Sequence, residues 1–383
     1  MGEPDGRTKL RHSGEVDAFD YALDESSIAQ RPVEPRSSSR LLVHLEVGSE
    51  PLDATVAELP QFLRPGDLLV VNRTRVIPAR LLLEKESGGR VEVLLLERNI
   101  GEPSDETIGP KDTSEPASEC EWVALVRPGR RVPPGTKLWY GDRHAVTVGA
   151  ELPERDGRRF VEVIGPDVID LAGSVPLPPY IKSPLEDPER YQTVYGSSPG
   201  SVAAPTAGLH LTHEVLDACK LAGAALATVD LVVGLDTFRP ITADKPEDHQ
   251  MHTERYAVPE ATMLACEQSE RVVAVGTTTV RALESVASTG ILSGRTDLFI
   301  RADYPFRLVD VMLTNFHLPR SSLLLLVDSF YGPGWRDLYG LGARRGYRFL
   351  SFGDAMLIGR DVGRGRDVGR GRDVGRGRDV GRG

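Results

Sequence analysis

The chain has 383 residues, 40% of them hydrophobic and 27% charged, which is enough to bury a large core in two or three domains. We expect no secretory signal after the polar N-terminus, and the longest apolar run, Leu323–Val327, is too short to span a bilayer. The three cysteines form no CxxC motif, which argues against a disulfide framework or zinc site and predicts a cytoplasmic protein.

The net charge of −10 counts against a nucleic-acid partner, but phosphate responds to charges within a Debye length of roughly 10 Å. Arginines cluster at Arg73–Arg80 and at Arg127–Arg131. Each cluster is either solvated surface or part of an RNA-binding face, so charge alone leaves the partner undecided.

The predicted elements begin after residues 1–16, which are polar and expected to be disordered. Strands are expected at Leu41–Leu45 and Leu68–Val71. From residue 78 to 164, short strands separated by glycines and polar turns predict a small all-β barrel. Within it, the acidic, Ser- and Pro-rich stretch Asn99–Glu119 is expected to be a flexible loop.

Beyond residue 180 the pattern becomes α/β. Helices are predicted at Thr212–Ala222, Pro259–Ser269 and Val280–Ser288, and strands at Ala225–Val233, Arg271–Val275, Asp297–Ile300 and Ser322–Val327. This alternation implies a mostly parallel sheet covered by helices. We therefore predict a barrel-like α/β main domain (17–77 and 165–358) with an inserted small β-barrel domain (78–164).

Tandem RDVGRG copies fill residues 360–383. One valine in six residues cannot build a core, so residues 359–383 are expected to be a low-complexity tail. The tail is either a tether for RNA or an extension without a binding role.

Two segments surround a histidine with small residues, a proline and a hydroxyl: GSVAAPTAGLH ends at His210, and TNFHLP contains His317. Neither has the period of a helix or strand. Histidine titrates nearest to neutral pH, so two loops that present an imidazole indicate an enzyme. Thr206, Gly208 and Asn315 in these loops are predicted to contact substrate.

The segment RVVAVGTTTVRALE reads as a buried strand, a glycine, a threonine cluster and a helix. Amides at a helix N-terminus attract anions. Gly276, Thr277, Thr278 and Arg281 are therefore predicted to seat a carboxylate or a ribose hydroxyl, although a routine strand-to-helix turn has the same pattern. No GxGxxG, Walker or HExxH motif supports a dinucleotide, P-loop or zincin enzyme.

His249, His252 and Glu254 in DHQMHTERY have the residue types of a metal site, but a polar loop entering a strand explains them equally well. We predict that His252 and Glu254 line the active site without metal. Tyr191 and Gln192 in ERYQTVY offer an aromatic face and an amide to a flat base or a cation, or form an ordinary amphipathic turn.

Five motifs occur in the order of one family: GSVAAPTAGLH, DHQMHTE, GTTTVRALES, TNFHLPRSS and YRFLSFGDAM, which contains Asp354. The stretches FDYALDESSIAQRPVEPRSSSRLLV and LRPGDLLVVNRTRVIPARL point the same way. From about Asp17 to Ile358 the chain resembles the S-adenosylmethionine:tRNA ribosyltransferase-isomerases of the queuosine pathway. Val232, Asp236 and Arg73 depart from the pattern of that family.

The resemblance implies transfer of the ribosyl group of S-adenosylmethionine, a co-substrate, to 7-aminomethyl-7-deazaguanine at the wobble position of the tRNA anticodon loop. Isomerisation gives epoxyqueuosine and releases adenine and methionine. It also implies an α/β domain with a β-barrel insertion, no metal and a monomer or weak homodimer.

A sulfonium acidifies its neighbouring 5′ carbon, so His210 and His317 are candidates for proton transfer, with Glu254 or Asp354 as orienting group or base. Two alternatives stay open. One is the same chemistry on a small 7-deazapurine, and the other is a catalytically silent homologue that binds RNA or S-adenosylmethionine.

Overall fold

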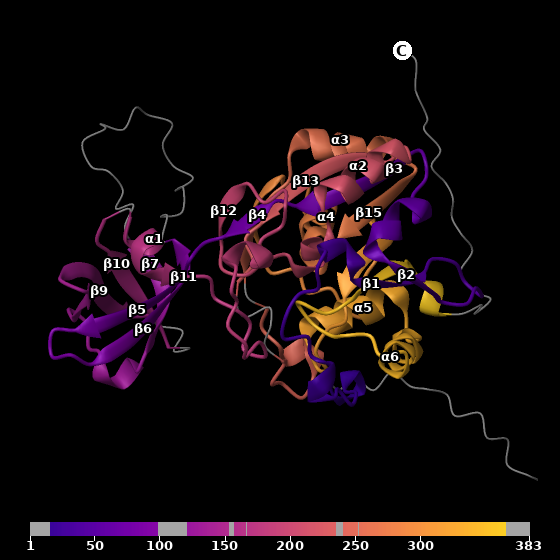
Figure 1. Cartoon of the computed structure of the whole chain (residues 1–383). Helices are drawn as coiled ribbons and strands as arrows, with labels where there is room; N and C mark the ends of the chain where they lie inside the picture. The colour runs from indigo at the N-terminus through magenta and orange to yellow at the C-terminus, as the bar shows by residue number, and fades with distance from the viewer. Residues whose placement is uncertain are drawn as a thin grey trace, which may run out of the picture.

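The computed structural model describes residues 16–98, 121–152, 157–165, 167–234, 240–251 and 253–364. It consists of a large α/β domain and a small β-barrel beside it (Figure 1). The predicted fold class, an α/β domain with an inserted all-β barrel, is confirmed.

A nine-stranded mixed sheet organises the large domain. Its order is β16 (Ser293–Thr296), β14 (Glu254–Ala257), β13 (Ala225–Leu231), β3 (Asp67–Asn72), β15 (Arg271–Val275), β17 (Val311–Asn315), β18 (Ala355–Gly359), β1 (Arg40–His44) and β2 (Leu52–Thr55). The central strands β13, β3, β15 and β17 are parallel to one another. No described pairing joins β16 to β2, so the expected barrel-like sheet is open.

Helices cover both faces of this sheet. They are α2 (His213–Leu221), α3 (Glu260–Gln268), α4 (Thr277–Thr289), α5 (Ser322–Tyr331) and α6 (Trp335–Arg344). Along β15, Val272 and Ala274 pack into the core formed with α4, α5 and α6, whereas Val273 and Val275 pack on the side of α2. Burial on both faces explains why the parallel strands are continuous apolar runs.

Six strands form the closed barrel: β5 (Arg80–Lys85), β6 (Arg90–Arg98), β7 (Glu121–Arg127), β10 (Arg158–Val163), β9 (Arg143–Glu151) and β8 (Lys137–Tyr140). Pairing of β5 with β8 closes it. Helix α1 (Val168–Ala172) packs on its core, and β11 (Gly173–Ser174) pairs with β5. The barrel elements thus continue to Ser174, past the expected boundary at residue 164. Strand β4 (Thr74–Val76), paired with β12 (Ser198–Ser201), lies at the connection (Figure 1).

Most predicted elements are observed within a few residues, but two strand predictions are wrong. The apolar run Ser322–Val327 belongs to helix α5, and Asp297–Ile300 has no strand, because β16 ends at Thr296. A short apolar run does not distinguish a buried strand from a buried helix. Here Ser321 caps the helix by accepting a hydrogen bond from the Leu324 amide at 3.2 Å.

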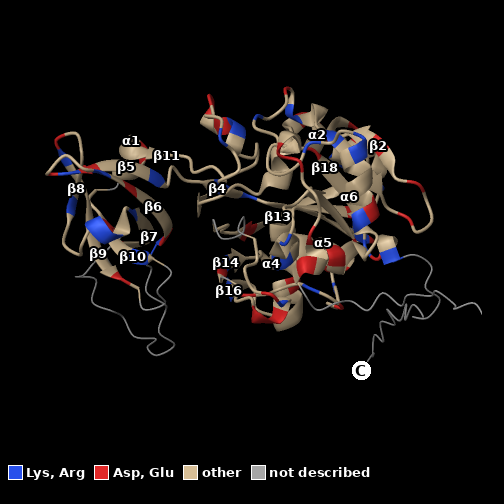
Figure 2. Ribbon diagram, turned by 90° about the horizontal axis from the view of Figure 1, so that it is seen from below, with Lys and Arg blue, Asp and Glu red and all other residues tan. Residues whose placement is uncertain are grey.

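The expectations for residues 1–15, the loop 99–120 and the tail from residue 365 lie outside the described residues. Residues 360–364, which begin the first RDVGRG copy, are part of the fold, because Val362 is buried and Arg360 pairs with Asp310 at 3.2 Å. None of the described helices is long and apolar enough to cross a membrane. Acidic and basic residues are interspersed over both domains (Figure 2).

Candidate active site

Three adjoining cavities lie at one edge of the large sheet. The parallel strands β13, β3, β15 and β17 end there, and the crevice at the carboxyl ends of parallel strands is where α/β proteins bind ligands. Two small cavities, which we call the histidine cavities, share Thr206, Asn315 and His317 in their walls. A third cavity of about 90 Å³, the interdomain cavity, has walls from both domains. Leu323 lines all three, so they form one composite site.

His317 is the imidazole that faces this site. Its Nε2 lies 2.8 Å from the Thr314 hydroxyl, and its backbone amide donates to the Tyr339 hydroxyl at 3.1 Å. No partner is found for Nδ1 among the described residues, while the ring lines both histidine cavities. Burial lowers the pKa of His317 to about 3, so the ring is neutral at physiological pH. The unoccupied nitrogen is available to a proton, and because burial disfavours the charged ring, an imidazolium formed there would be a strong acid.

His210 has both ring nitrogens engaged. Nδ1 lies 2.9 Å from the Ser39 hydroxyl and Nε2 lies 3.0 Å from the Asn315 side-chain nitrogen. Because an amide nitrogen only donates, Nε2 is the acceptor and Nδ1 carries the proton. Burial, followed by the charges of Arg348, Arg190 and Arg36, lowers the pKa of His210 to about 3. Its ring lines a separate cavity with Ser39, so the two histidines are linked through Asn315 without sharing a cavity.

Asn315 is held in one orientation. The Thr206 hydroxyl donates to its Oδ1 at 3.0 Å, and its Nδ2 also donates to the Leu350 carbonyl at 3.2 Å. Beside them, Gly276 precedes helix α4 as its N-cap and has φ at +88°, a value that residues with a side chain rarely adopt. Thr277 and Thr278 complete this wall. The structure therefore brings together Thr206, Asn315 and His317 from the two histidine loops with the β15–α4 turn.

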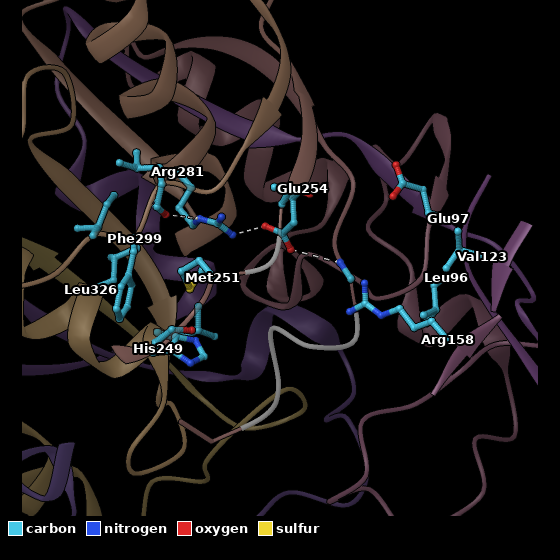
Figure 3. Close-up of a pocket in the computed structure, with 16 residues that line it drawn as sticks. Leu96, Glu97, Val123, Arg158, His249, Met251, Glu254, Arg281, Phe299 and Leu326 are labelled. Atoms are coloured by element: carbon cyan, nitrogen blue, oxygen red, sulfur yellow. Dashed lines mark hydrogen bonds and ion pairs between the residues drawn. The ribbon is translucent and has the colours of Figure 1, made fainter. Parts of the chain in front are cut away.

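A buried ion pair between Glu254 and Arg281 lies at the interdomain cavity (Figure 3). Arg281 Nε donates to the Leu298 carbonyl at 3.1 Å, and the Gly234 amide donates to Glu254 at 3.3 Å. Arg281 Nη2 is buried and has no hydrogen-bond partner among the described residues. A buried guanidinium group with an unused donor is suited to a carboxylate ligand.

The walls around this ion pair are apolar on one side and come from the barrel on the other. Met251, Phe299 and Leu326 supply the apolar wall, and the His249 ring packs edge-on against Phe299 at 5.5 Å. The barrel contributes Leu96, Glu97, Val123 and Arg158 (Figure 3).

Glu97 connects the domains directly. Its carboxylate accepts from Arg255 Nε at 2.6 Å and from Arg295 Nη1 and Nη2 at 2.6 and 3.0 Å. Burial raises the pKa of Glu97, but hydrogen bonds and charges from Arg295 and Arg255 outweigh it and lower the pKa below its usual value. Strand β6 of the barrel is thereby tied to β14 and β16.

Several predicted site residues lie away from the three cavities. Tyr191 is buried in a core, with its ring edge-on to Phe352 at 5.8 Å. The Gln192 side chain accepts from the Val76 amide at 3.0 Å and donates to its carbonyl at 2.8 Å. Both side chains therefore make contacts within the protein and face none of the three cavities.

Gly208 and Asp354 also have internal partners. A Cβ atom at Gly208 would lie 2.0 Å from the Tyr195 hydroxyl, so the glycine allows close packing. Asp354 accepts from the backbone amides of Arg40 at 3.0 Å and Arg348 at 2.8 Å. The carboxylate ties the start of β1 to the loop at Arg348 and lines none of the cavities described above.

The remaining predictions concern a metal site and the residues that depart from the family pattern. His252 and Asp236 lie outside the described residues, and within the described ranges no group of three His, Cys, Asp or Glu is arranged to hold a metal. Arg73 forms an ion pair with Asp230 at 2.9 Å.

Sequence reasoning missed Glu97, Arg158 and Leu323. Glu97 and Arg158 carry no motif, and only the packing of the barrel against the large domain gives them a place at the site. Leu323 was assigned to a strand, which concealed its position at the start of α5.

Comparison with known proteins shows which family the chain belongs to. A family model described as queuosine biosynthesis protein matches residues 16–358. S-adenosylmethionine:tRNA ribosyltransferase-isomerases from Rubrobacter xylanophilus and Gloeobacter violaceus are 49% and 47% identical, each over 90% of this chain and over 97% and 95% of their own lengths. A crystal structure of S-adenosylmethionine tRNA ribosyltransferase from Thermotoga maritima, 35% identical, covers 89% of this chain and 99% of its own, with a TM-score of 0.49. On the strength of the family match and these relatives, the chain belongs to the queuosine biosynthesis protein family.

Proposed function

We propose that this protein is an S-adenosylmethionine:tRNA ribosyltransferase-isomerase. It transfers the ribosyl group of S-adenosylmethionine to 7-aminomethyl-7-deazaguanine in tRNA, isomerises it to the epoxycyclopentane of epoxyqueuosine, and releases adenine and methionine. The two relatives named above, 49% and 47% identical over 90% of the chain, support this reaction. The structural observation that carries it is the His317 imidazole in the wall of both histidine cavities, which share Leu323 with the interdomain cavity.

His317 is our candidate for proton transfer. A sulfonium acidifies the adjacent C5′–H bond, and the neutral ring accepts that proton while the electron pair stays on carbon. The resulting imidazolium then returns the proton to a ring nitrogen of adenine as the glycosidic bond breaks. Methionine leaves with the electron pair of the carbon–sulfur bond and needs no proton.

His210 acts as a positioning residue in this proposal. Its hydrogen bond fixes Asn315, which in turn holds the Thr206 hydroxyl beside His317. Protonation of Nε2 would oppose the amide donor that it accepts from, so His210 stays neutral during the reaction.

Arg281 and Glu254 are our candidates for binding the methionyl end of S-adenosylmethionine. The free Nη2 of Arg281 suits its carboxylate, and Glu254 suits its ammonium group. The apolar wall at Met251, Phe299 and Leu326 matches the methylene chain between that group and the sulfonium. Phe299 also offers an aromatic ring to the sulfonium charge.

The proposed acceptor is the modified wobble base in the anticodon loop, used by a monomer or weak homodimer in the cytoplasm. The test is incubation of the protein with S-adenosylmethionine and tRNA that carries 7-aminomethyl-7-deazaguanine, with adenine measured by chromatography. Adenine release only with this tRNA supports the proposal. Release with the free base identifies a small-molecule enzyme, and no release with either acceptor identifies a silent homologue. Unmodified tRNA is the matched control.

A further inference from the structure

One outer face of the barrel runs from the interdomain cavity to a larger groove. Across four neighbouring strands, Arg80, Leu94, Leu125 and Arg158 are directly opposed in register. Strand residues two apart share a face, so Glu92 and Leu94 lie on the same side of β6, as do Val123, Leu125 and Arg127 on β7. The inner positions between them are buried in the barrel core.

This face borders two cavities. Val123 and Arg158 line the interdomain cavity, whereas Leu94, Leu125 and Arg127 line a groove of about 770 Å³. The opposite wall of the groove is the proline-rich segment from Ser174 to Pro188. A ligand lying along the barrel face can therefore occupy the groove while its end reaches the proposed active site.

Arg127 at the end of β7 lines the groove, and the loop that follows it carries further exposed positive charge. Arg127, Arg130 and Arg131 are exposed, and no ion pair or side-chain hydrogen bond is found for them among the described residues. The loop backbone is nevertheless held. Lys85 donates to the Arg131 carbonyl at 3.3 Å, and Arg159 donates to the carbonyls of Val132 at 2.6 Å and Gly129 at 3.3 Å.

Uncompensated arginines on an anchored loop are suited to phosphate. They attract it without first breaking an ion pair, and a held backbone reduces the ordering needed on binding. The half-exposed Leu94 and Leu125 beside Arg80 offer an apolar and guanidinium surface on which unstacked bases can pack.

We infer that this face is the RNA-binding surface, with the Arg127–Arg131 loop contacting phosphates of the acceptor RNA and the groove holding its single-stranded loop. The inference rests on the proposed function, because it takes the acceptor to be tRNA. It explains how a chain of net charge −10 binds a polyanion, since the attraction is local to one loop.

The test is the triple variant Arg127→Gln/Arg130→Gln/Arg131→Gln, assayed for adenine release with modified tRNA. We expect the KM for tRNA to rise about tenfold, with the KM for S-adenosylmethionine unchanged. The slope of log affinity against log salt should fall by about 0.7 to 0.9 for each phosphate that the variant no longer binds. The melting temperature should not change, because these side chains hold no described part of the fold.

The control compares two single variants, each of which removes one exposed positive charge. Arg130→Gln should raise the KM for tRNA, whereas Arg344→Gln, on α6 in the large domain, should leave it unchanged. A wild-type KM for tRNA and an unchanged salt slope in the triple variant would overturn the inference while the proposed function stands. Absence of tRNA-dependent adenine release in the wild-type protein would instead overturn the proposed function.

Discussion

His210 Nε2 accepts a hydrogen bond from the Asn315 side chain at 3.0 Å, which joins two histidine-bearing loops separated by 105 residues. The same amide accepts from Thr206, so three polar side chains form one chain of hydrogen bonds. His317, two residues after Asn315, is the imidazole that faces the cavities. We therefore propose different roles for the two histidines, with His210 as a positioning residue and His317 as the proton acceptor.

Replacing the two histidines should therefore give different kinetics. We expect His317→Gln to lower kcat by at least about 100-fold with little change in the KM for tRNA, because general base catalysis contributes about that much. His210→Gln should lower kcat about tenfold, because glutamine can still accept from Asn315 and donate to Ser39. Single-turnover adenine release measures both, and equal losses in the two variants would contradict the assignment.

The buried histidines also predict a loss of stability in acid. The unfolded state takes up a proton on each histidine below about pH 6.5, whereas the folded state does so only near pH 3. The free energy of unfolding should thus fall by about 1.4 kcal/mol per pH unit for each histidine between these values.

Urea unfolding at several pH values between 7 and 5 measures how the free energy of unfolding changes with pH. This change should be smaller per pH unit in His210→Gln than in the wild type, because one titrating histidine is missing. Ser39→Ala is the matched control, because it removes the hydrogen bond to Nδ1 and keeps the titrating group. Identical slopes in His210→Gln and wild type would refute the prediction.

Of the candidate site residues, those in loops at the end of the parallel strands were easier to place together from sequence than the others. Loops that follow parallel strands gather at one sheet edge, so His317, Asn315 and Thr278 could be placed together from motif order and strand pattern alone. Tyr191 and Gln192 have equally polar neighbours, but a single sequence does not show which polar side chains are used in internal hydrogen bonds.

Prediction of the fold from the sequence was limited in a similar way. Alternation of apolar residues identified the barrel strands, but nothing in the segment GRVEVLLLER marks Glu97 as a contact between domains. That contact depends on how two separately folded cores pack, which local sequence periodicity does not encode. The strand prediction for Ser322–Val327 was wrong for a related reason. Burial on all sides removes the alternation of polar and apolar residues that distinguishes a helix from a strand.

Variants of the Glu254–Arg281 ion pair can distinguish its contribution to folding stability from its proposed role in binding S-adenosylmethionine. Removing one partner by Glu254→Met leaves the buried Arg281 guanidinium without the carboxylate of this ion pair and should destabilise the fold by about 3–5 kcal/mol. The double variant Glu254→Met/Arg281→Met should recover most of that loss, because an apolar pair often replaces a buried ion pair without penalty.

Binding should not recover in the same way. If Arg281 holds the carboxylate of S-adenosylmethionine, the double variant stays folded by thermal melting yet shows no binding in calorimetric titration. Wild-type affinity in the double variant would exclude this ion pair as the methionyl site.

The contacts of Glu97 with Arg255 and Arg295 should fix the orientation of the barrel. These side chains are about one-third exposed, so Glu97→Gln should cost only about 1 kcal/mol in overall stability. Loss of the bridge removes the described ion pairs between β6 and the strands β14 and β16, so the domains should separate more widely. Small-angle X-ray scattering should show a larger radius of gyration, and kcat should fall because the barrel wall of the interdomain cavity moves.

Glu92→Gln removes an ion pair with Arg80 inside the barrel, so it should leave the radius of gyration unchanged. Equal scattering profiles for Glu97→Gln and Glu92→Gln would show that other contacts hold the two domains together.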